Sequence, residues 1–380
     1  MRKILFVTRH DPFVRTGGGL ATKAFLNAFT TLYPDLVELV IADNCRVNDS
    51  VSVCKIHKVK RRSFIMRFCS LLTGHLHRFT PFLKELIKRN DYSLCVLDGS
   101  VIGGDMVEIL NGVGIKTITI HHNFEQEYHV DSKTIESFFG FFPYYIRRNE
   151  RNAYLYSSLN LFLTQADYRK FLNYYGFPQG ISHVIGCFEP QSESYNCESV
   201  LVKNSKKVLV ITGAMDAYQT VNSVMDYYGN YWSETLRILD DFLLILAGRN
   251  PSTKILETIG RKENVVIVPN PVNISEVVVK GDIFVCPVNI GGGLKLRLMD
   301  GLRNGLLILV HEVSARGYDM FLNEPWFKVY HDVASYAEGL MELNKLKQVE
   351  YSRQIRAKYN EYFSFEAGLS RLSDALADLE

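Results

Sequence analysis

Short apolar runs alternate along the chain with longer stretches in which apolar residues recur every three or four positions. The longer stretches, such as Leu20, Ala24 and Ala28, have the period of an amphipathic helix. This alternation of strand and helix is typical of parallel sheets covered by helices. The apolar runs predict strands at 3–8, 36–42, 94–97, 116–120, 159–164, 207–212, 242–247, 265–268, 282–288 and 306–310.

A polar stretch at 189–206, rich in Gln, Ser, Glu, Asn and Lys, interrupts this alternation and predicts a linker. It would separate an N-terminal Rossmann-like domain, 1–188, from a C-terminal one, 207–360. The 380 residues suffice for two such domains. Leucines recur at helical spacing in the tail, so 361–380 is expected to form a helix that crosses back to the N-terminal domain.

The strand at 282–288 runs into three consecutive glycines, Gly291–Gly293, and a helix is predicted directly after them, over 294–302. Glycines leave backbone amides open to a ligand, and a helix start adds partial positive charge. Lys295 and Arg297 lie beside the apolar stripe of this helix, and Asp300 follows one turn later. Two cations suit a diphosphate and a carboxylate suits a sugar hydroxyl, so we predict a nucleoside-diphosphate site. An ordinary glycine turn with a solvated helix is the alternative.

The first strand also leads to a glycine run, Gly17–Gly19, but eight residues intervene and the glycines are contiguous. This spacing argues against the G-x-G-x-x-G fingerprint of dinucleotide binding. The strand at 116–120 ends in His121 and His122. Adjacent strand residues point to opposite faces, so the pair is a poor joint metal site, and we favour His122 alone as a site residue.

Charge and cysteine content narrow the class of protein. A net charge of +2 gives no reason to expect nucleic acid as a partner. Seven cysteines without a C-x-x-C pair indicate reduced thiols and a cytoplasmic protein. No apolar run approaches the length of a membrane span, and the first residues form a strand rather than a signal peptide.

Residues 55–90 are strongly basic, with ten Lys or Arg against one acid, Glu85. Interleaved aromatic and leucine residues predict a basic amphipathic helix that contacts the membrane inner face peripherally or binds an acidic acceptor. A solvated helix face is the alternative. The aromatic run at 138–145, followed by arginines, predicts a core lid or a second platform for an acceptor or lipid.

Several motifs together resemble the GT-B glycosyltransferases, and more narrowly glycosyltransferase family 4. No single motif is specific, but their order spans nearly the whole chain. The motifs are His122–Asn123–Phe124–Glu125, Gly213–Ala214–Met215–Asp216, Gly248–Arg249–Asn250–Pro251, Pro287 through Gly291–Gly293 to Asp300, and Phe363–Ser364–Phe365–Glu366.

This resemblance implies two Rossmann-like domains facing across a cleft, the first binding the acceptor and the second binding the nucleotide-sugar donor. It implies a retaining glycosyltransferase that passes a sugar from a nucleoside-diphosphate sugar to a glycan or lipid-linked acceptor, in cell-surface polysaccharide or glycolipid synthesis. No metal cofactor is implied. A catalytically weak or inactive GT-B binding protein and a GT-B sugar-nucleotide epimerase are the alternatives.

The resemblance also implies roles for individual residues. The catalytic set is His122, Arg297 and Asp300, of which Asp300 is one methylene shorter than the family's glutamate. The donor-binding set is Gly17, Gly18, Gly19, Gly213, Arg249, Pro269, Asn270, Gly292, Gly293, Lys295, Arg297 and Asp300.

Overall fold

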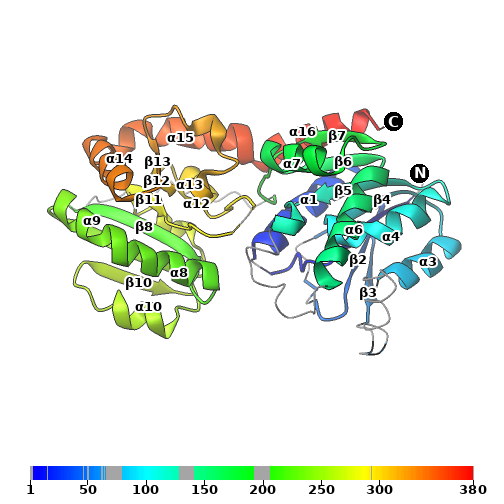
Figure 1. Cartoon of the computed structure of the whole chain (residues 1–380), viewed down its shortest axis with the longest axis horizontal. Helices are drawn as coiled ribbons and strands as arrows, with labels where there is room; N and C mark the ends of the chain where they lie inside the picture. The colour runs from blue at the N-terminus through cyan, green and yellow to red at the C-terminus, as the bar shows by residue number, and fades with distance from the viewer. Residues whose placement is uncertain are drawn as a thin grey trace. The chain divides into compact units, whose positions relative to one another are not determined.

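In a computed structural model, the chain forms two compact units (Figure 1). Unit 1 comprises Met1–Ser192 and Tyr362–Glu380, and unit 2 comprises Glu193–Glu361. The structure describes residues 3–14, 16–45, 47–48, 51–60, 63, 65, 79–127, 141–191, 206–291 and 293–379.

Unit 1 is built on a seven-stranded parallel sheet with the order β3-β2-β1-β4-β5-β6-β7. Every residue of β2 is buried, as expected for a strand covered on both faces. Side chains of β1 and β4 join those of α4 in one apolar cluster, which includes Leu5, Leu97 and Met106. The strands are β1 (Lys3–Thr8), β2 (Val37–Ala42), β3 (Lys55–Val59), β4 (Tyr92–Asp98), β5 (Lys116–His121), β6 (Leu159–Phe162) and β7 (Ile181–Val184).

The helices of unit 1 follow the strands as right-handed crossovers require. They are α1 (Gly17–Leu32), α3 (Phe79–Arg89), α4 (Ser100–Asn111), α6 (Phe141–Tyr156), α7 (Gln165–Tyr175) and α16 (Phe365–Ala377). Thr16 begins α1 because its side chain accepts a hydrogen bond from the amide of Gly19. The three glycines therefore form the first turn of α1 rather than a loop before it.

Unit 2 repeats the design with a six-stranded parallel sheet, ordered β10-β9-β8-β11-β12-β13. Its strands are β8 (Lys207–Ala214), β9 (Phe242–Arg249), β10 (Val265–Pro269), β11 (Ile283–Cys286), β12 (Leu307–His311) and β13 (Phe327–Tyr330). Its helices are α8 (Tyr218–Asp226), a π-helix (Tyr227–Tyr231), α9 (Trp232–Ile238), α10 (Thr253–Thr258), α11 (Ser275–Val278), α12 (Leu298–Arg303), α13 (Glu312–Ala315), a 3₁₀ turn (Asp319–Phe321), α14 (Val333–Lys345) and α15 (Gln348–Phe363).

The last helix, α16, belongs to unit 1 although it follows unit 2 in the sequence, as the tail pattern predicted. Arg371 on α16 donates to the carbonyl oxygen of Ile185 at 2.6 Å. Gly368 lies against the ring of Phe188, where an added Cβ would come within 2.0 Å of the ring. These contacts attach α16 to the segment that follows β7, at Ile185 and Phe188.

Two of our predictions about elements are wrong. The helix predicted at 294–302 begins at Leu298, because Gly291 and Gly293 adopt positive φ and keep the chain in a loop through Lys295. The basic stretch 55–90 does not begin as a helix: Lys55–Val59 is the edge strand β3, paired with β2. Most of the predicted basic helix, 61–78, and the aromatic run 138–140 lie outside the described residues, except Ser63 and Ile65.

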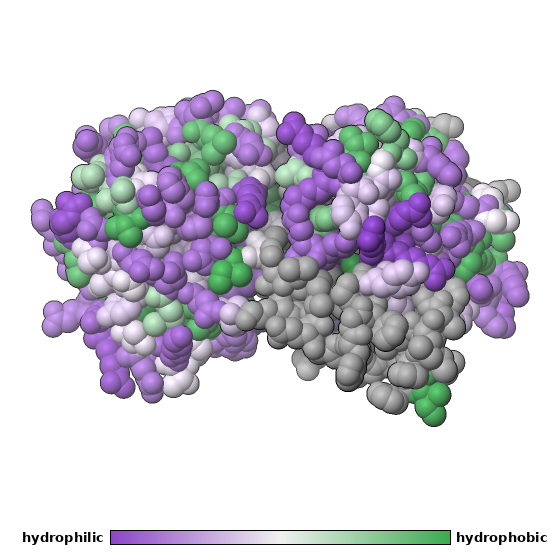
Figure 2. Space-filling model, in the orientation of Figure 1, coloured by the Kyte–Doolittle hydropathy of each residue, from purple (hydrophilic) through white to green (hydrophobic). Residues whose placement is uncertain are grey.

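No helix among the described residues is long and apolar enough to cross a membrane. On the face shown in Figure 2, apolar residues form small patches between hydrophilic ones over the coloured part of the surface. Scattered patches of this kind are ordinary on folded proteins.

Candidate functional sites at the strand ends of the two units

Each sheet reverses its strand order at one point, between β1 and β4 in unit 1 and between β8 and β11 in unit 2. Helices leave the sheet in opposite directions at such a point, and this opens a crevice at the carboxyl ends of the strands. Arg297 and Asp300 contact the end of β8 at this point of unit 2, and His122 contacts the end of β4 at this point of unit 1. Each unit is described by itself below.

In unit 2, the guanidinium of Arg297 lies against Gly213 at the end of β8. Its Nη1 donates to the carbonyl oxygen of Thr212 at 3.1 Å, and its Nη2 donates to the hydroxyl oxygen of Thr220 at 3.0 Å. A Cβ at Gly213 would lie 2.4 Å from Nη1, so only glycine lets the guanidinium occupy this position. Arg297 is thus fixed at the switch point by two acceptors.

Asp300, on the first turn of α12, lies beside the same strand end. Thr212 donates its hydroxyl to Oδ2 of Asp300 at 3.4 Å, and Arg303 donates to Oδ1 at 2.9 Å. The carboxylate is therefore ion-paired with Arg303 on its own helix. Thr212 therefore contacts both residues: its hydroxyl binds Asp300 and its carbonyl oxygen binds Arg297.

The glycine loop is closed by Lys295. This residue is only 8% exposed, and its Nζ donates to the carbonyl oxygen of Gly291 at 2.9 Å. Tyr318 donates its hydroxyl to the carbonyl oxygen of Lys295 at 3.0 Å. Gly293 has a φ of 71°, and Gly292 lies outside the described residues. The structure thus places Lys295 in the wall of the loop, before the helix in which we expected it.

Arg249, Pro269 and Asn270 stand at the ends of the neighbouring strands β9 and β10. Asn270 accepts the backbone amide of Asn250 on its Oδ1 at 3.0 Å and donates its own amide to Gly248 at 2.7 Å. Both asparagines have φ near 50°, a conformation uncommon outside glycine. Arg249 lies 3.8 Å from Asp216, and both are well exposed. These bonds tie the three strand-end loops together.

In unit 1, His122 follows β5 and contacts a fully buried carboxylate. Its Nε2 lies 2.6 Å from Oδ1 of Asp98. Thr8 and Thr22 both donate hydroxyl protons to Oδ2 of the same residue. Burial alone would raise the pKa of Asp98, but its interactions with His122, His10 and Thr22 together outweigh burial and lower that pKa to about 2. Because Asp98 is ionised, Nε2 carries a proton and donates it to the carboxylate.

A second histidine, His10, lies in the loop after β1. Its ring centroid is 5.5 Å from that of His122, and desolvation lowers its pKa to about 4. A Cβ at Gly18 would lie 2.7 Å from Nδ1 of His10, whereas a Cβ at Gly17 would meet nothing within 4 Å. At Gly19 a Cβ would strike the carbonyl oxygen of Asp11 at 2.5 Å. Of the three glycines, Gly18 is therefore the one that makes room for His10, and Gly19 makes room for the backbone of the preceding loop.

The neighbouring His121 points to the other side of the sheet, as strand geometry predicts. It stacks on Phe162 at 4.6 Å and exchanges a hydrogen bond with Asn160 at 2.8 Å. Its burial lowers its pKa to about 4, so it is a neutral core residue. Of the two histidines, only His122 lies with the other candidate residues.

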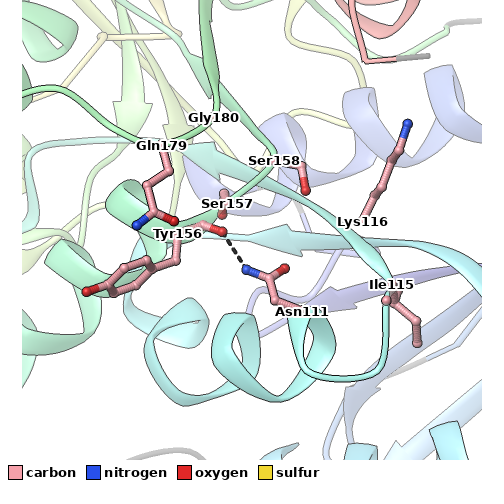
Figure 3. Close-up of a pocket in the computed structure, with 9 residues that line it drawn as sticks. Asn111, Ile115, Lys116, Tyr156, Ser157, Ser158, Gln179 and Gly180 are labelled. Atoms are coloured by element: carbon pink, nitrogen blue, oxygen red, sulfur yellow. Dashed lines mark hydrogen bonds between the residues drawn. The ribbon is translucent and has the colours of Figure 1, made fainter.

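A pocket of about 350 Å³ opens at the other end of the unit 1 sheet, where β5, β6 and β7 begin (Figure 3). Asn111 donates to the carbonyl oxygen of Tyr156 at 2.7 Å across it. Lys116 extends away from these two residues in the figure and donates to the carbonyl oxygen of Leu379. Neither candidate site contributes to this pocket, whose lining is Asn111, Gly114–Lys116, Tyr156–Ser158, Gln179 and Gly180.

Sequence reasoning did not select Asp98, His10 or Thr220 for the site. Asp98 had a usable signal, because an acid that ends a buried strand directly before Gly99–Ser100 stands at a sheet's carboxyl edge. His10 and Thr220 had none, since their contacts join segments distant in the sequence. Within the described residues, no group of three or more His, Cys, Asp or Glu side chains could hold a metal ion.

Comparison with known proteins shows which solved structures share this fold. No family model matches the sequence, and no curated protein matches it. Solved structures match over nearly its whole length at low identity. Sucrose-phosphate synthase from Thermosynechococcus elongatus has a TM-score of 0.70 at 11% identity, covering 100% of this chain and 99% of that chain. Anabaena HepE in complex with UDP has a TM-score of 0.70 at 9% identity, covering 99% of both chains.

The lipopolysaccharide outer core galactosyltransferase WaaB has a TM-score of 0.67 at 12% identity, again covering 99% of both chains. At these identities the likeness concerns the fold. Two doubly wound parallel-sheet units, with the last helix returned to the first unit, are the GT-B architecture that the sequence motifs predicted.

Proposed function

We propose that the protein is a retaining glycosyltransferase. It would transfer a sugar from a nucleoside-diphosphate sugar to a glycan or lipid-linked acceptor, in the synthesis of a polysaccharide or glycolipid. The observation that carries this proposal is Arg297, fixed over Gly213 at the switch point of unit 2. HepE, of similar fold, is solved with UDP and with UDP-glucose, which supports a nucleotide sugar as donor.

The chemistry follows from the charge that develops. Breaking the anomeric C–O bond of the donor leaves negative charge on the departing diphosphate. A fixed cation that already faces this charge lowers the barrier without reorganising. Thr212 and Thr220 each take one of the five N–H donors of Arg297, so the guanidinium can still donate to phosphate oxygens. We propose that this cation stabilises the leaving group without a bound metal.

Other predicted residues take supporting roles in this proposal. Asp300 would bind the nucleotide ribose, and the loop at Pro269–Asn270 would lie along the base. Gly293, and Gly292 beside it, would offer amides to the phosphates. In unit 1, His122 would lie beside the reacting sugar, with its ring held in orientation by the buried Asp98. Gly17–Gly19 would approach the diphosphate with the first turn of α1.

Arg297→Gln tests the proposal. A panel of UDP, GDP, ADP and dTDP, with EDTA present, should contain one ligand that raises the stability of the wild type. A site at a hundredfold excess of ligand over Kd adds about 2.7 kcal/mol. Arg297→Gln should lose most of this stabilisation and at least tenfold in transferase activity. The matched control is Arg237→Gln, which removes an exposed arginine paired with Glu234 on α9.

Retained diphosphate binding in Arg297→Gln would refute the assignment of the phosphate site. Activity that disappears in EDTA but returns with a divalent cation would refute the metal-independent mechanism.

We also propose that unit 1 touches an anionic membrane surface through the basic stretch 55–90. Within its described part, α3 exposes Lys84 and Lys88, which supports attraction to anionic headgroups, and its Arg89 is paired with Glu85. The protein should co-sediment with phosphatidylglycerol vesicles at low salt and release at high salt. Lys84→Glu with Lys88→Glu should weaken this binding, whereas Lys254→Glu in unit 2 should not. Equal sedimentation with phosphatidylcholine vesicles would argue against the electrostatic contact.

A further inference from the structure

The proposed function gives Arg297 the central part, and the structure shows what holds this side chain in place. An arginine has several rotatable bonds, and fixing them costs conformational entropy each time a ligand binds. Here Thr220 on α8 and the carbonyl of Thr212 on β8 hold the guanidinium from two elements at once. The side chain of Arg297 is therefore already held in one conformation before a ligand binds.

Thr220 is placed by its own surroundings. The residue is 1% exposed, so its hydroxyl is removed from water and its contact with Nη2 faces little competition from solvent. Its methyl group lies 3.2 Å from the place where a Cβ of Gly213 would stand. The threonine thus presents one polar atom to the guanidinium and an apolar one to the strand end.

We propose that Thr220 is a positioning residue for recognition of the donor diphosphate. It acts through Arg297, whose fork it orients, and does not itself touch the ligand. This inference rests on the proposed function, because it assumes that Arg297 binds phosphate. A hydrogen bond to a charged group contributes more than one between neutral groups, and its loss would let the guanidinium sample other rotamers.

The first test compares Thr220→Val, which keeps the shape and removes the acceptor, with Thr220→Ser, which keeps the acceptor. Both are titrated with the nucleoside diphosphate that binds the wild type among UDP, GDP, ADP and dTDP, and with its nucleoside. Thr220→Val should weaken diphosphate binding by about tenfold, with nucleoside binding unchanged within about twofold. Thr220→Ser should bind within about threefold of the wild type. Should the valine variant not fold, Thr220→Ala takes its place.

The second test is a double-mutant cycle with Arg297→Gln. If Thr220 acts through Arg297, the valine substitution should have no further effect on diphosphate binding once Arg297 is gone. A further tenfold loss in the Arg297→Gln background would overturn the inference, as would an equal loss of nucleoside and diphosphate binding in Thr220→Val. These results differ from a failure of the proposed function, which would show as unchanged binding in Arg297→Gln, or as no diphosphate bound by the wild type.

Discussion

At the scale of residues, unit 1 keeps several ionisable side chains out of water beside His122. Asp98 is ionised there because hydroxyl and imidazole donors surround it, whereas the nearby Glu150 is not. Glu150 on α6 accepts the amide of Glu125 at 2.6 Å and the hydroxyl of Tyr175 at 2.9 Å. Burial still dominates and raises the pKa of Glu150 to about 8. Two buried carboxyl groups of one unit thus differ at neutral pH: Asp98 is ionised and Glu150 is mostly protonated.

This raised pKa predicts how stability depends on pH. Between the ordinary value of 4.5 and about 8, folded Glu150 keeps a proton that the unfolded chain releases. Its contribution is therefore fully present below pH 4.5 and is lost as pH rises through 8. Glu150→Gln stays neutral, so its free energy of unfolding relative to the wild type should rise by a few kcal/mol at most between pH 5 and pH 8.

Urea unfolding at pH 5, 6.5 and 8 measures this difference. Glu85→Gln, which replaces an exposed carboxylate on α3, is the control and should follow the wild type at all three values. Parallel curves for Glu150→Gln and the wild type would show that Glu150 is ionised in the folded protein.

A site residue could be predicted from the sequence where it follows a glycine run that interrupts the apolar pattern of a strand. Arg297 was selected because it follows a glycine run after a strand, and the structure places it at the switch point. Lys295 was selected by the same reasoning but is turned into the loop. Side-chain direction in a loop with two positive-φ glycines depends on backbone angles that periodicity does not encode. The ligand roles of both residues stay predictions.

At the scale of elements, most strands follow from apolar runs because both faces of a parallel sheet are buried. The exceptions are edge strands. β3 contains two lysines and a histidine, and β7 and β13 have four residues each, so none carries a long apolar run. The start of α12 was predicted too early. Leucines recur at helical spacing from Leu294 onward, but the positive φ angles of Gly291 and Gly293 keep the segment before Leu298 out of the helix.

The contact between α4 and α6 depends on two small residues of α4. A Cβ at Gly104 would lie 2.6 Å from Cα of Asn149, and one at Gly103 would lie 2.4 Å from Cβ of Ala153. The helices must separate to admit either atom. Gly104→Ala should therefore destabilise the protein by about 1–3 kcal/mol despite the better helix propensity of alanine.

Thermal and urea unfolding measure this loss. Gly229→Ala is the matched control, since a Cβ there meets nothing within 4 Å. A Gly104→Ala variant as stable as the wild type would show that α4 and α6 are not in close contact.

At the scale of the whole molecule, one topology is used twice. In both units the second and third strands extend the sheet to one side of the first strand, and the fourth pairs with its other side. The sequence predicts this repetition because strand and helix alternate in both halves. It does not show what either unit binds, because the decisive contacts, such as those of His122 with Asp98, bring together residues from separate strand ends.

The return of α16 to unit 1 has a consequence for biosynthesis. A polypeptide is synthesised from its N-terminus to its C-terminus. All of unit 2 therefore emerges from the ribosome before residues 362–379. Until then Phe188 lacks the helix that covers it, and the carbonyl of Ile185 lacks its partner Arg371. Unit 1, which precedes unit 2 in the sequence, is therefore completed only after unit 2 has been synthesised.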